Sequence, residues 1–392
     1  MHQSSHRRAS LSAEDPEPLA LIAATLRGEP SPYPADVSTE FAETLLDTCA
    51  AHGVGPLLRH FLAELGIEKS WPAVIQDRLR ESALATVANE LTWESEISEI
   101  LAQLADTGVQ SLLLKGAPLA YTLYPKPDLR PRCDTDLLVV PAQRDLTIQV
   151  LEQAGYRAAE SAGGRLASYQ TAFSRSLGAG RSHVIDLHWR INNAQVFARA
   201  FGFDELAAEA MPVPRLGPAA RAPCPVHALL IACLHRTAHL GPPIDVAGLP
   251  YLEANRLIWL YDIHLLANTL SGADWSRLTD LAEAKGLRAV CLDGLRTTQR
   301  YLRMVVADEA LDRLAAPGPP ELAARYLAAA PLRRHWLDLR ALPGWRERLR
   351  LLHEWTIPPA DYMFRKYDGT SRWLLPWLYL RRAITGIDRR RP

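Results

Sequence analysis

The chain has 392 residues, of which 48% are apolar and 22% are charged, and its 44 lysines and arginines balance its 44 acidic residues. This length exceeds what one ordinary core holds, so we expect a soluble globular protein with two or three domains or subdomains. Because the formal net charge is zero, no whole-molecule field attracts a long nucleic acid or an acidic membrane. We therefore do not expect a long nucleic acid as a partner, while a local basic patch stays an alternative.

The five cysteines are odd in number, scattered and without a C-x-x-C pair. This pattern argues against a disulfide framework or a zinc knuckle and for a reducing compartment. The N-terminus lacks the apolar core of a secretory signal, and no apolar run approaches the ~20 residues of a membrane span. We therefore expect a cytoplasmic protein with no membrane span. The segment "RWLLPWLYLRRAI" would suit a membrane surface, but Pro376 interrupts it and we expect it to pack in the core.

Helical patterns dominate the first part of the chain. Residues 1–14 are polar and predict a disordered tail. Residues 15–109 predict an N-terminal helical region, which includes a long amphipathic run from Trp71 to Leu104.

The pattern changes over residues 110–215. Strands are predicted at "VQSLLLK", "TDLLVV", "SYQTAFSR" and "SHVIDLHWRI", and helices at "GAPLAYTLY" and "PAQRDLTIQVLEQAGY". This alternation predicts an α/β (α+β) core with a small mixed sheet. A Pro- and Gly-rich linker, "MPVPRLGPAARAPCP", follows, and residues 225–392 predict a C-terminal helical region. The core is thus flanked by helices on both sides.

Three aspartates suggest a metal site. In a strand, Asp134 and Asp136 would point to the same face about 6.5 to 7 Å apart. Two such carboxylates can share metal ions held about 3.5 to 4 Å apart, as in phosphoryl transfer. Asp186 lies mid-strand between apolar residues, where an ion is costly unless it is paired or bound to metal. If the strands are neighbours, the three acids can hold Mg²⁺ or Mn²⁺. The alternative for Asp186 is a structural ion pair with an arginine.

Other residues suit the phosphates of a nucleotide. Gly116 stands where a strand feeds a helix, which lets the backbone approach a phosphate closely. Lys115 could reach a triphosphate oxygen, and Arg130 and Arg132 could add phosphate contacts. His188 shares the face of Asp186 and would border the site.

Together these motifs resemble the catalytic core of the DNA polymerase beta-like nucleotidyltransferase superfamily. Three segments, "LLKGAPLAYTLYP", "LRPRCDTDLLV" and "IDLHWRI", are similar to its bacterial family of uncharacterised nucleotidyltransferases, and "NRLIWLYDIHLLA" resembles that family's downstream helix. The resemblance implies that Gly116 marks the nucleotide turn, that Asp134 and Asp136 bind metal, and that Asp186 is the third acid. Ala117 follows Gly116 where the superfamily usually has serine, so Lys115 would replace a hydroxyl contact to phosphate.

The resemblance implies a metal-dependent nucleotidyltransferase that transfers NMP from an NTP, with ATP expected, to a hydroxyl or phosphate acceptor and releases pyrophosphate. The acceptor can be a small molecule, a peptide or a protein hydroxyl. Members of the family occur beside genes for ribosomally made peptides, which hints at peptide natural product biosynthesis. One alternative is a non-catalytic module that binds a nucleotide or peptide. Another is a kinase that would yield ADP.

Downstream histidines and an aspartate offer weaker signals. His235 and His239 lie at i and i+4, with His227 about two turns earlier, which suits zinc but also cleft lining or simple packing. Asp262, amid an apolar stripe, is expected to pair with an arginine of the core.

Overall fold

The computed structural model describes residues 17–159, 166–178, 180–240, 244–246, 249–251, 255–367 and 372–388. The predicted disordered tail, residues 1–14, lies outside the described residues. Within them no helix is long and apolar enough to cross a membrane.

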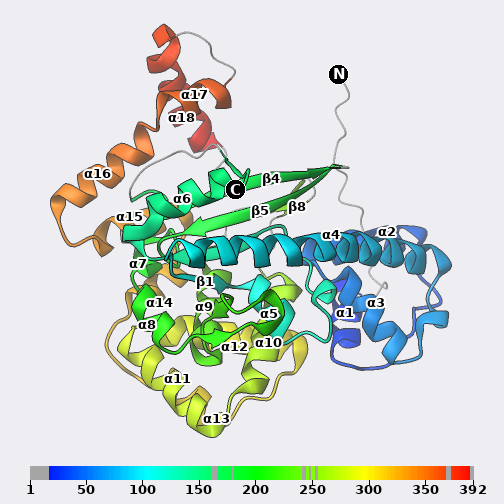
Figure 1. Cartoon of the computed structure of the whole chain (residues 1–392). Coiled ribbons are helices and arrows are strands. Elements are labelled where there is room, and N and C mark those ends of the chain that lie inside the picture. The colour runs from blue at the N-terminus through cyan, green and yellow to red at the C-terminus, as the bar shows by residue number, and fades with distance from the viewer. Residues whose placement is uncertain are drawn as a thin grey trace.

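The N-terminal region is helical, as predicted. Ser38 begins the second helix by accepting a hydrogen bond from the Phe41 amide, and Gly53, at φ 66°, ends it. The last and longest helix runs from this helical bundle to the sheet (Figure 1), so it joins the two parts of the molecule. The elements are α1 (Pro18–Leu26), α2 (Thr39–His52), α3 (Gly55–Glu64), η1 (Glu68–Ser70) and α4 (Ala73–Asp106).

The core is a five-stranded mixed sheet in the order β1-β2-β5-β4-β3. The pairs β1·β2, β4·β5 and β3·β4 are antiparallel, and β2·β5 is parallel. This confirms the predicted α/β core with a mixed sheet and flanking helices. Its elements are β1 (Ser111–Leu114), α5 (Gly116–Thr122), η2 (Pro127–Leu129), β2 (Thr135–Val139), η3 (Pro141–Gln143), α6 (Arg144–Gln153), β3 (Arg157–Ala158), β4 (Gln170–Gly178) and β5 (Arg181–His188).

The two faces of the sheet pack against different layers. One face, which includes Leu137 and Ile185, shares a buried cluster with α4 and α6. The opposite face, which includes Leu114 and Leu138, joins a larger cluster with α5 and the C-terminal helices. Strand residues alternate between faces, so this second face also carries the polar residues of the site.

The predicted linker is not a simple connection. Met211–Pro212 (β6) pairs with Arg221–Ala222 (β7) as a two-stranded sheet, and η4 (Pro214–Leu216) lies between them. Apolar side chains of this segment, such as Leu216, are buried against the sheet cluster. The prediction missed this because prolines and glycines obscured the apolar residues between them. Before it lie α7 (Gln195–Ala198) and α8 (Phe203–Ala208).

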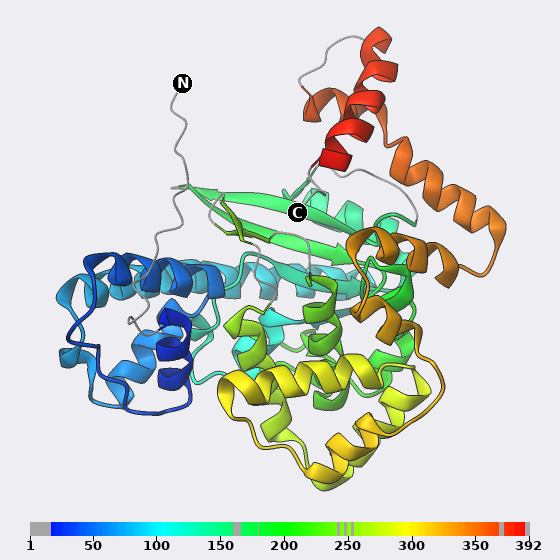
Figure 2. The same ribbon diagram turned by 180° about the vertical axis from the view of Figure 1, so that it is seen from behind.

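The C-terminal region is helical, as predicted, with one short hairpin. Figure 2 shows α11–α14 (yellow) below the sheet and the last helices (orange to red) reaching away from it. The elements are α9 (Pro225–Ala238), β8 (Ile244–Val246), β9 (Leu249–Tyr251), α10 (Leu257–Thr269), α11 (Gly272–Ala284), α12 (Arg288–Leu302), α13 (Asp308–Ala315), α14 (Leu322–Leu327), α15 (Pro331–Ala341), α16 (Trp345–Thr356), α17 (Ala360–Lys366), η5 (Arg372–Leu374) and α18 (Leu375–Asp388).

The predicted core packing of "RWLLPWLYLRRAI" is wrong for its tryptophans. Trp373 is 93% exposed and Trp377 is 55% exposed, whereas Leu378 is buried. Exposed and buried apolar side chains therefore alternate in the described part of this segment. The boundaries of the predicted domains stay a prediction.

Candidate active site

Two of the predicted acids lie directly opposite each other in the sheet. The parallel register of β2 and β5 pairs Asp136 with Asp186 and Leu138 with His188. Ligand atoms of Asp136, Asp186 and His188 all lie within 4.8 Å of one another, and all three side chains are buried. Strands distant in sequence thus bring together an acidic pair and an imidazole on one face.

Asp134 lies next to this triple but not in it. Strand β2 begins at Thr135, so Asp134 immediately precedes the strand, and the expected spacing of its carboxylate from Asp136 stays a prediction. Burial and the charge of Asp136 raise the pKa of Asp134 to about 6, while Lys115 opposes the shift. The Asp134 carboxylate is therefore close enough to Asp136 and Lys115 to interact with their charges.

Lys115 contacts Asp136 in the turn between β1 and α5. Its Nζ lies 2.5 Å from Asp136 Oδ1, and its side chain is 17% exposed. The backbone of Lys115 has φ 54° and ψ −127°, an uncommon conformation for a residue with a side chain. The positive φ of this turn therefore falls on Lys115 and not on Gly116.

The charges at the site are mutually dependent. Burial alone would raise the pKa of Asp136, but the Lys115 charge and a hydrogen bond from His188 hold this pKa below its usual range. Burial and Lys115 lower the pKa of His188, yet its bonds to Asp136 and Asp186 outweigh them and raise it. His188 Nε2 lies 2.8 Å from Asp136 Oδ1 and 3.4 Å from Asp186 Oδ2. Asp136 is therefore an ionised carboxylate whose charge is stabilised by Lys115 and by the hydrogen bond from His188.

The donor set fits a hard divalent cation. Gln170 Nε2 donates to Asp186 Oδ2 at 2.7 Å, but Asp186 Oδ1 is buried without a hydrogen-bond partner among the described residues. His188 Nδ1 is likewise buried and without a partner in the described part of the chain. Buried polar atoms are rarely left unsatisfied, so each such atom needs an explanation. A cation bound between Asp136 and Asp186 would give the buried Asp186 Oδ1 atom a partner.

Gly116 is required by close packing. A Cβ on Gly116 would lie 3.0 to 3.3 Å from the guanidinium atoms of Arg130. Arg130 is itself held by Asp262 of α10, through Nε at 2.8 Å to Oδ1 and Nη2 at 2.7 Å to Oδ2. This confirms the expected pairing of Asp262 with an arginine of the core. The guanidinium is thus occupied, and the predicted contact of Arg130 with phosphate stays a prediction.

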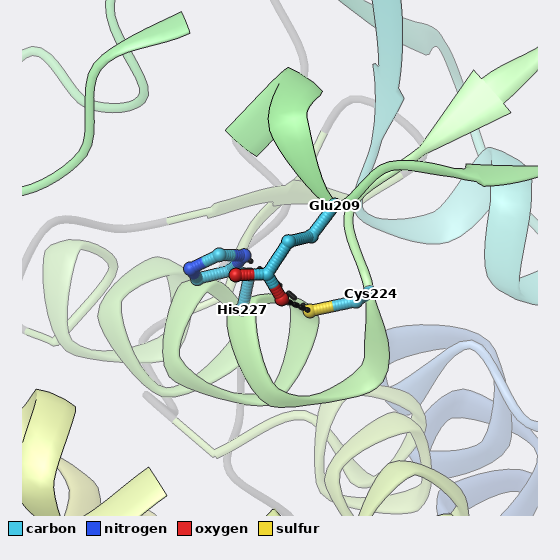
Figure 3. Close-up of side chains that lie close together, drawn as sticks. All are labelled: Glu209, Cys224 and His227. Carbon is cyan, nitrogen blue, oxygen red and sulfur yellow. Dashed lines mark hydrogen bonds between the residues drawn. The ribbon is translucent and has the colours of Figure 1, made fainter. Parts of the chain in front are cut away.

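The zinc alternative for His235 and His239 finds no third ligand among the described residues. Their rings lie 4.6 Å apart and contact Trp259 at 4.8 and 5.0 Å, as in the packing alternative. Neither belongs to a group of three metal-ligating side chains among the described residues. His227 lies elsewhere, beside Cys224 and Glu209 (Figure 3).

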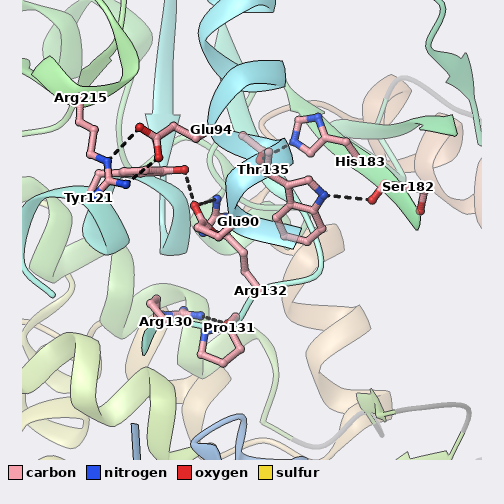
Figure 4. Close-up of polar contacts among 11 residues, drawn as sticks. Glu90, Glu94, Tyr121, Arg130, Pro131, Arg132, Thr135, Ser182, His183 and Arg215 are labelled. Carbon is pink, nitrogen blue, oxygen red and sulfur yellow. Dashed lines mark hydrogen bonds and ion pairs between the residues drawn. The ribbon is translucent and has the colours of Figure 1, made fainter. Parts of the chain in front are cut away.

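Helix α4 supports the site in a way that the sequence did not reveal. Glu90 accepts bonds from both terminal nitrogens of Arg132, at 2.7 and 2.8 Å, and contacts the Tyr121 hydroxyl (Figure 4). Glu94 holds Arg215 at 2.7 Å. The guanidinium of Arg132 is therefore also occupied, and its phosphate contact stays a prediction. An acid on the inner face of the long amphipathic run was the available signal.

A largely apolar cavity of about 310 Å³ is lined in part by Lys115. It is bounded by α5, α9, α10 and the β6·β7 hairpin, and its polar wall includes Arg130, Asp262 and His235. Burial holds the pKa of His235 well below its usual range, so this ring is neutral. The cavity can take an apolar group next to the lysine of the acid cluster.

The fold and site define an α/β protein with paired carboxylates beside a lysine-bearing turn. The chain matches the model of a family described as uncharacterised nucleotidyltransferase over residues 39–303. This match covers more than half of the chain, which therefore belongs to that family. A search of curated proteins finds no match.

Proposed function

We propose that the protein is a metal-dependent nucleotidyltransferase of the DNA polymerase beta-like superfamily. It would transfer NMP from an NTP, with ATP expected, to a hydroxyl or phosphate acceptor and release pyrophosphate. The pairing of Asp136 with Asp186 across β2 and β5, with one buried carboxylate oxygen unpartnered among the described residues, carries this proposal. Membership of a nucleotidyltransferase family supports it.

Asp134, Asp136 and Asp186 are the residues that would hold Mg²⁺ or Mn²⁺. Oxygen ligands of this kind suit hard cations. Bound there, the metal would neutralise the charge that develops on the phosphoryl oxygens.

Residues of the chain would position and activate the reactants. Lys115 would leave Asp136 and place its ammonium on a triphosphate oxygen, next to Gly116 at the turn. Asp186 would accept the proton of the acceptor hydroxyl. The acceptor oxygen then forms a bond to the α-phosphorus, the bond to the bridging oxygen breaks, and its electron pair leaves with pyrophosphate. Alignment of the reactants would provide much of the rate.

His188 would hold Asp136 in place. Its Nε2 hydrogen bond to Asp136 fixes the carboxylate that the metal would share with Asp186. Such a partner orients a metal ligand without touching the substrate. His188 is therefore proposed as a positioning residue at the border of the nucleotide site.

The acceptor is proposed to be a small molecule, a peptide or a protein hydroxyl. The apolar cavity that Lys115 helps to line favours an acceptor with an apolar group near the hydroxyl that reacts. We do not expect the acceptor to be a long polyanion such as a nucleic acid, because the chain has zero net charge. A cytoplasmic location and a link to peptide natural product biosynthesis stay predictions.

Incubation with each NTP, Mg²⁺ and a panel of hydroxyl-bearing acceptors tests the proposal. We expect a mass increase of one nucleotidyl group on the acceptor and stoichiometric pyrophosphate. Asp134→Asn and Asp186→Asn should reduce turnover by about 100-fold or more, since each removes charge stabilisation at the reacting phosphate. Asp280→Asn, at an exposed ion pair with Arg313, is the control and should keep full activity. Normal turnover in both site variants would contradict the mechanism.

The melting temperature provides a second readout for Asp134→Asn. Because burial and Asp136 already raise the pKa of Asp134, the substitution relieves repulsion. We expect an unchanged or higher melting temperature. Lost activity together with a lower melting temperature would indicate a structural role instead.

A non-catalytic nucleotide-binding or peptide-binding module is the second candidate. Ala117 in place of the usual serine, and the ion pair that already occupies Asp136, favour it. Calorimetry with ATP, with and without Mg²⁺, combined with a pyrophosphate assay separates the two. Binding without pyrophosphate release across the acceptor panel supports the module, and release of ADP supports a kinase.

A further inference from the structure

Three metal-ligating side chains gather at a place that the proposed reaction does not use. Cys224 Sγ lies 3.4 Å from His227 Nδ1 and 3.8 Å from Glu209 Oε2 (Figure 3). Ligand atoms of all three residues lie within 4.8 Å of one another. Glu209 follows α8, Cys224 precedes α9, and His227 lies in the first turn of α9.

The spacing matches a tetrahedral zinc centre. With metal–sulfur bonds of about 2.3 Å and metal–nitrogen or metal–oxygen bonds of about 2.0 to 2.2 Å, ligands at tetrahedral angles lie about 3.5 Å apart. The two distances from Cys224 Sγ bracket this value. A single ion could therefore bind all three atoms with only small side-chain movements.

The surroundings also suit a metal. Cys224 and His227 are buried, and Phe201 packs edge-on against the imidazole at 5.5 Å. Arg277 contacts the same Glu209 oxygen that faces Cys224. A carboxylate oxygen has two lone pairs, so it can accept from an arginine and still bind an ion. Arginine would then orient the ligating carboxylate from outside.

We propose that Glu209, Cys224 and His227 bind one Zn²⁺ ion, with water as the fourth ligand, and that this ion fastens the end of α8 to the start of α9. A thiolate and an imidazole select zinc over the magnesium expected at the aspartates. The C-x-x-H spacing at the start of α9 places two ligands about one helical turn apart, within reach of a single ion. Thiolate, carboxylate and Zn²⁺ together have zero net charge.

Binding must release the thiol proton. The Cys224 Sγ–H, which faces Glu209, would lose its proton to solvent as the zinc–sulfur bond forms. Calorimetry of the metal-free full chain with Zn²⁺ in buffers of different ionisation enthalpy measures this. We expect one ion and about one proton per chain. Zinc should also raise the melting temperature.

Cobalt identifies the ligands. Co²⁺ titrated into the metal-free protein should give a thiolate-to-cobalt charge-transfer band in the near ultraviolet. The band should be absent in Cys224→Ser and at least about 10-fold harder to saturate in His227→Gln and Glu209→Gln, as expected for loss of a ligand. Far-ultraviolet circular dichroism shows that each variant is folded.

Two controls keep this site apart from the acid cluster. Cys133→Ser removes the exposed thiol next to Asp134 and should leave the band intact. Asp186→Asn should also keep it, so failure of the proposed nucleotidyl transfer does not affect the result. No band in the wild-type chain, or a band lost only in Cys133→Ser, would overturn the proposal.

Discussion

Lys115 Nζ lies 2.5 Å from Asp136 Oδ1, so a lysine ammonium holds the carboxylate that is paired in register with Asp186. The Lys115 ammonium is also expected to bind a phosphate of the nucleotide, so it has two alternative partners. A metal ion and Lys115 would compete for Asp136, because both are attracted by the same charge. This competition gives the ion pair a measurable consequence.

Replacement of Lys115 by methionine should separate its roles. Without metal, Lys115→Met should lower the free energy of unfolding by up to about 3 kcal/mol, because a buried carboxylate loses a partner while His188 remains. The rise in melting temperature on adding Mg²⁺ should be larger than in the wild type, since no ammonium competes. Thermal melts with and without Mg²⁺ measure both effects.

Lys285→Met is the matched control for Lys115→Met. Lys285 pairs with Glu205 at 2.7 Å, away from the acids. This variant should show the wild-type response to Mg²⁺. A Mg²⁺ effect that is smaller in Lys115→Met than in the wild type would show that the lysine and the metal do not compete.

Gly116→Ala should destabilise the protein by steric conflict. The new methyl group would press on an Arg130 guanidinium that Asp262 holds fixed, at a cost of about 1 to 3 kcal/mol. Gly272→Ala is the control, because Gly272 is also the first residue of a helix but has no neighbour within 4 Å of a Cβ. It should be neutral or stabilising by about 0.4 to 1 kcal/mol. Urea unfolding measures both, and equal effects would contradict the steric argument.

Local patterns were enough to single out Asp136, Asp186 and His188 as candidate site residues, but not to predict how they are arranged. Side chains alternate within β5, which puts Asp186 and His188 on one face. The charge of Asp186 in an otherwise apolar strand requires a partner in any fold. Register could not be predicted in the same way. That Asp136 lies opposite Asp186 depends on the parallel pairing of β2 with β5, which are separated in sequence by α6, β3 and β4, and no local pattern specifies this pairing.

Most contacts between segments that are distant in sequence were not predicted from the sequence. Glu90 of α4 holds Arg132, and Asp262 of α10 holds Arg130. Arginines before an acidic motif suggested phosphate contacts, but their partners are 42 and 132 residues away in sequence. Of these two pairings, only that of Asp262 with an arginine was predicted, from an acid in an apolar stripe.

The Arg130–Asp262 pair should be a main anchor of the C-terminal helices. Both residues are buried, and Tyr124 also donates to Asp262 at 2.8 Å. Asp262→Leu should cost about 3 to 5 kcal/mol, because it leaves a buried guanidinium without its partner. Arg130→Met should then cost much less in the Asp262→Leu background than in the wild type. Chemical unfolding of the four proteins measures the coupling, and additive costs would show that the pair contributes no such anchor.

His183 has an environment that permits only the neutral ring. It lies on the face of β5 away from the acids, with Tyr156 Oη 2.6 Å from Nδ1 and Thr135 Oγ1 3.0 Å from Nε2. The Trp93 ring lies 5.6 Å away. Burial, with Arg132 and Arg175 nearby, lowers the pKa of His183 to about 3.

This shift makes stability depend on pH in a defined direction. Because the pKa of His183 is lower in the folded chain than its ordinary value of 6.5, the unfolded chain takes up the proton first as the pH falls. The stabilising effect is complete above pH 6.5 and is lost between pH 6.5 and about 3. At pH 5 the loss is about 2 kcal/mol.

His183→Gln, which can still bond Thr135 and Tyr156, should therefore lose about 2 kcal/mol less stability than the wild type between pH 8 and pH 5. His353→Gln, at an exposed position of α16, should keep the wild-type pH dependence in the same urea titrations. Equal slopes for His183→Gln and the wild type would mean that the ring is not held neutral by the fold.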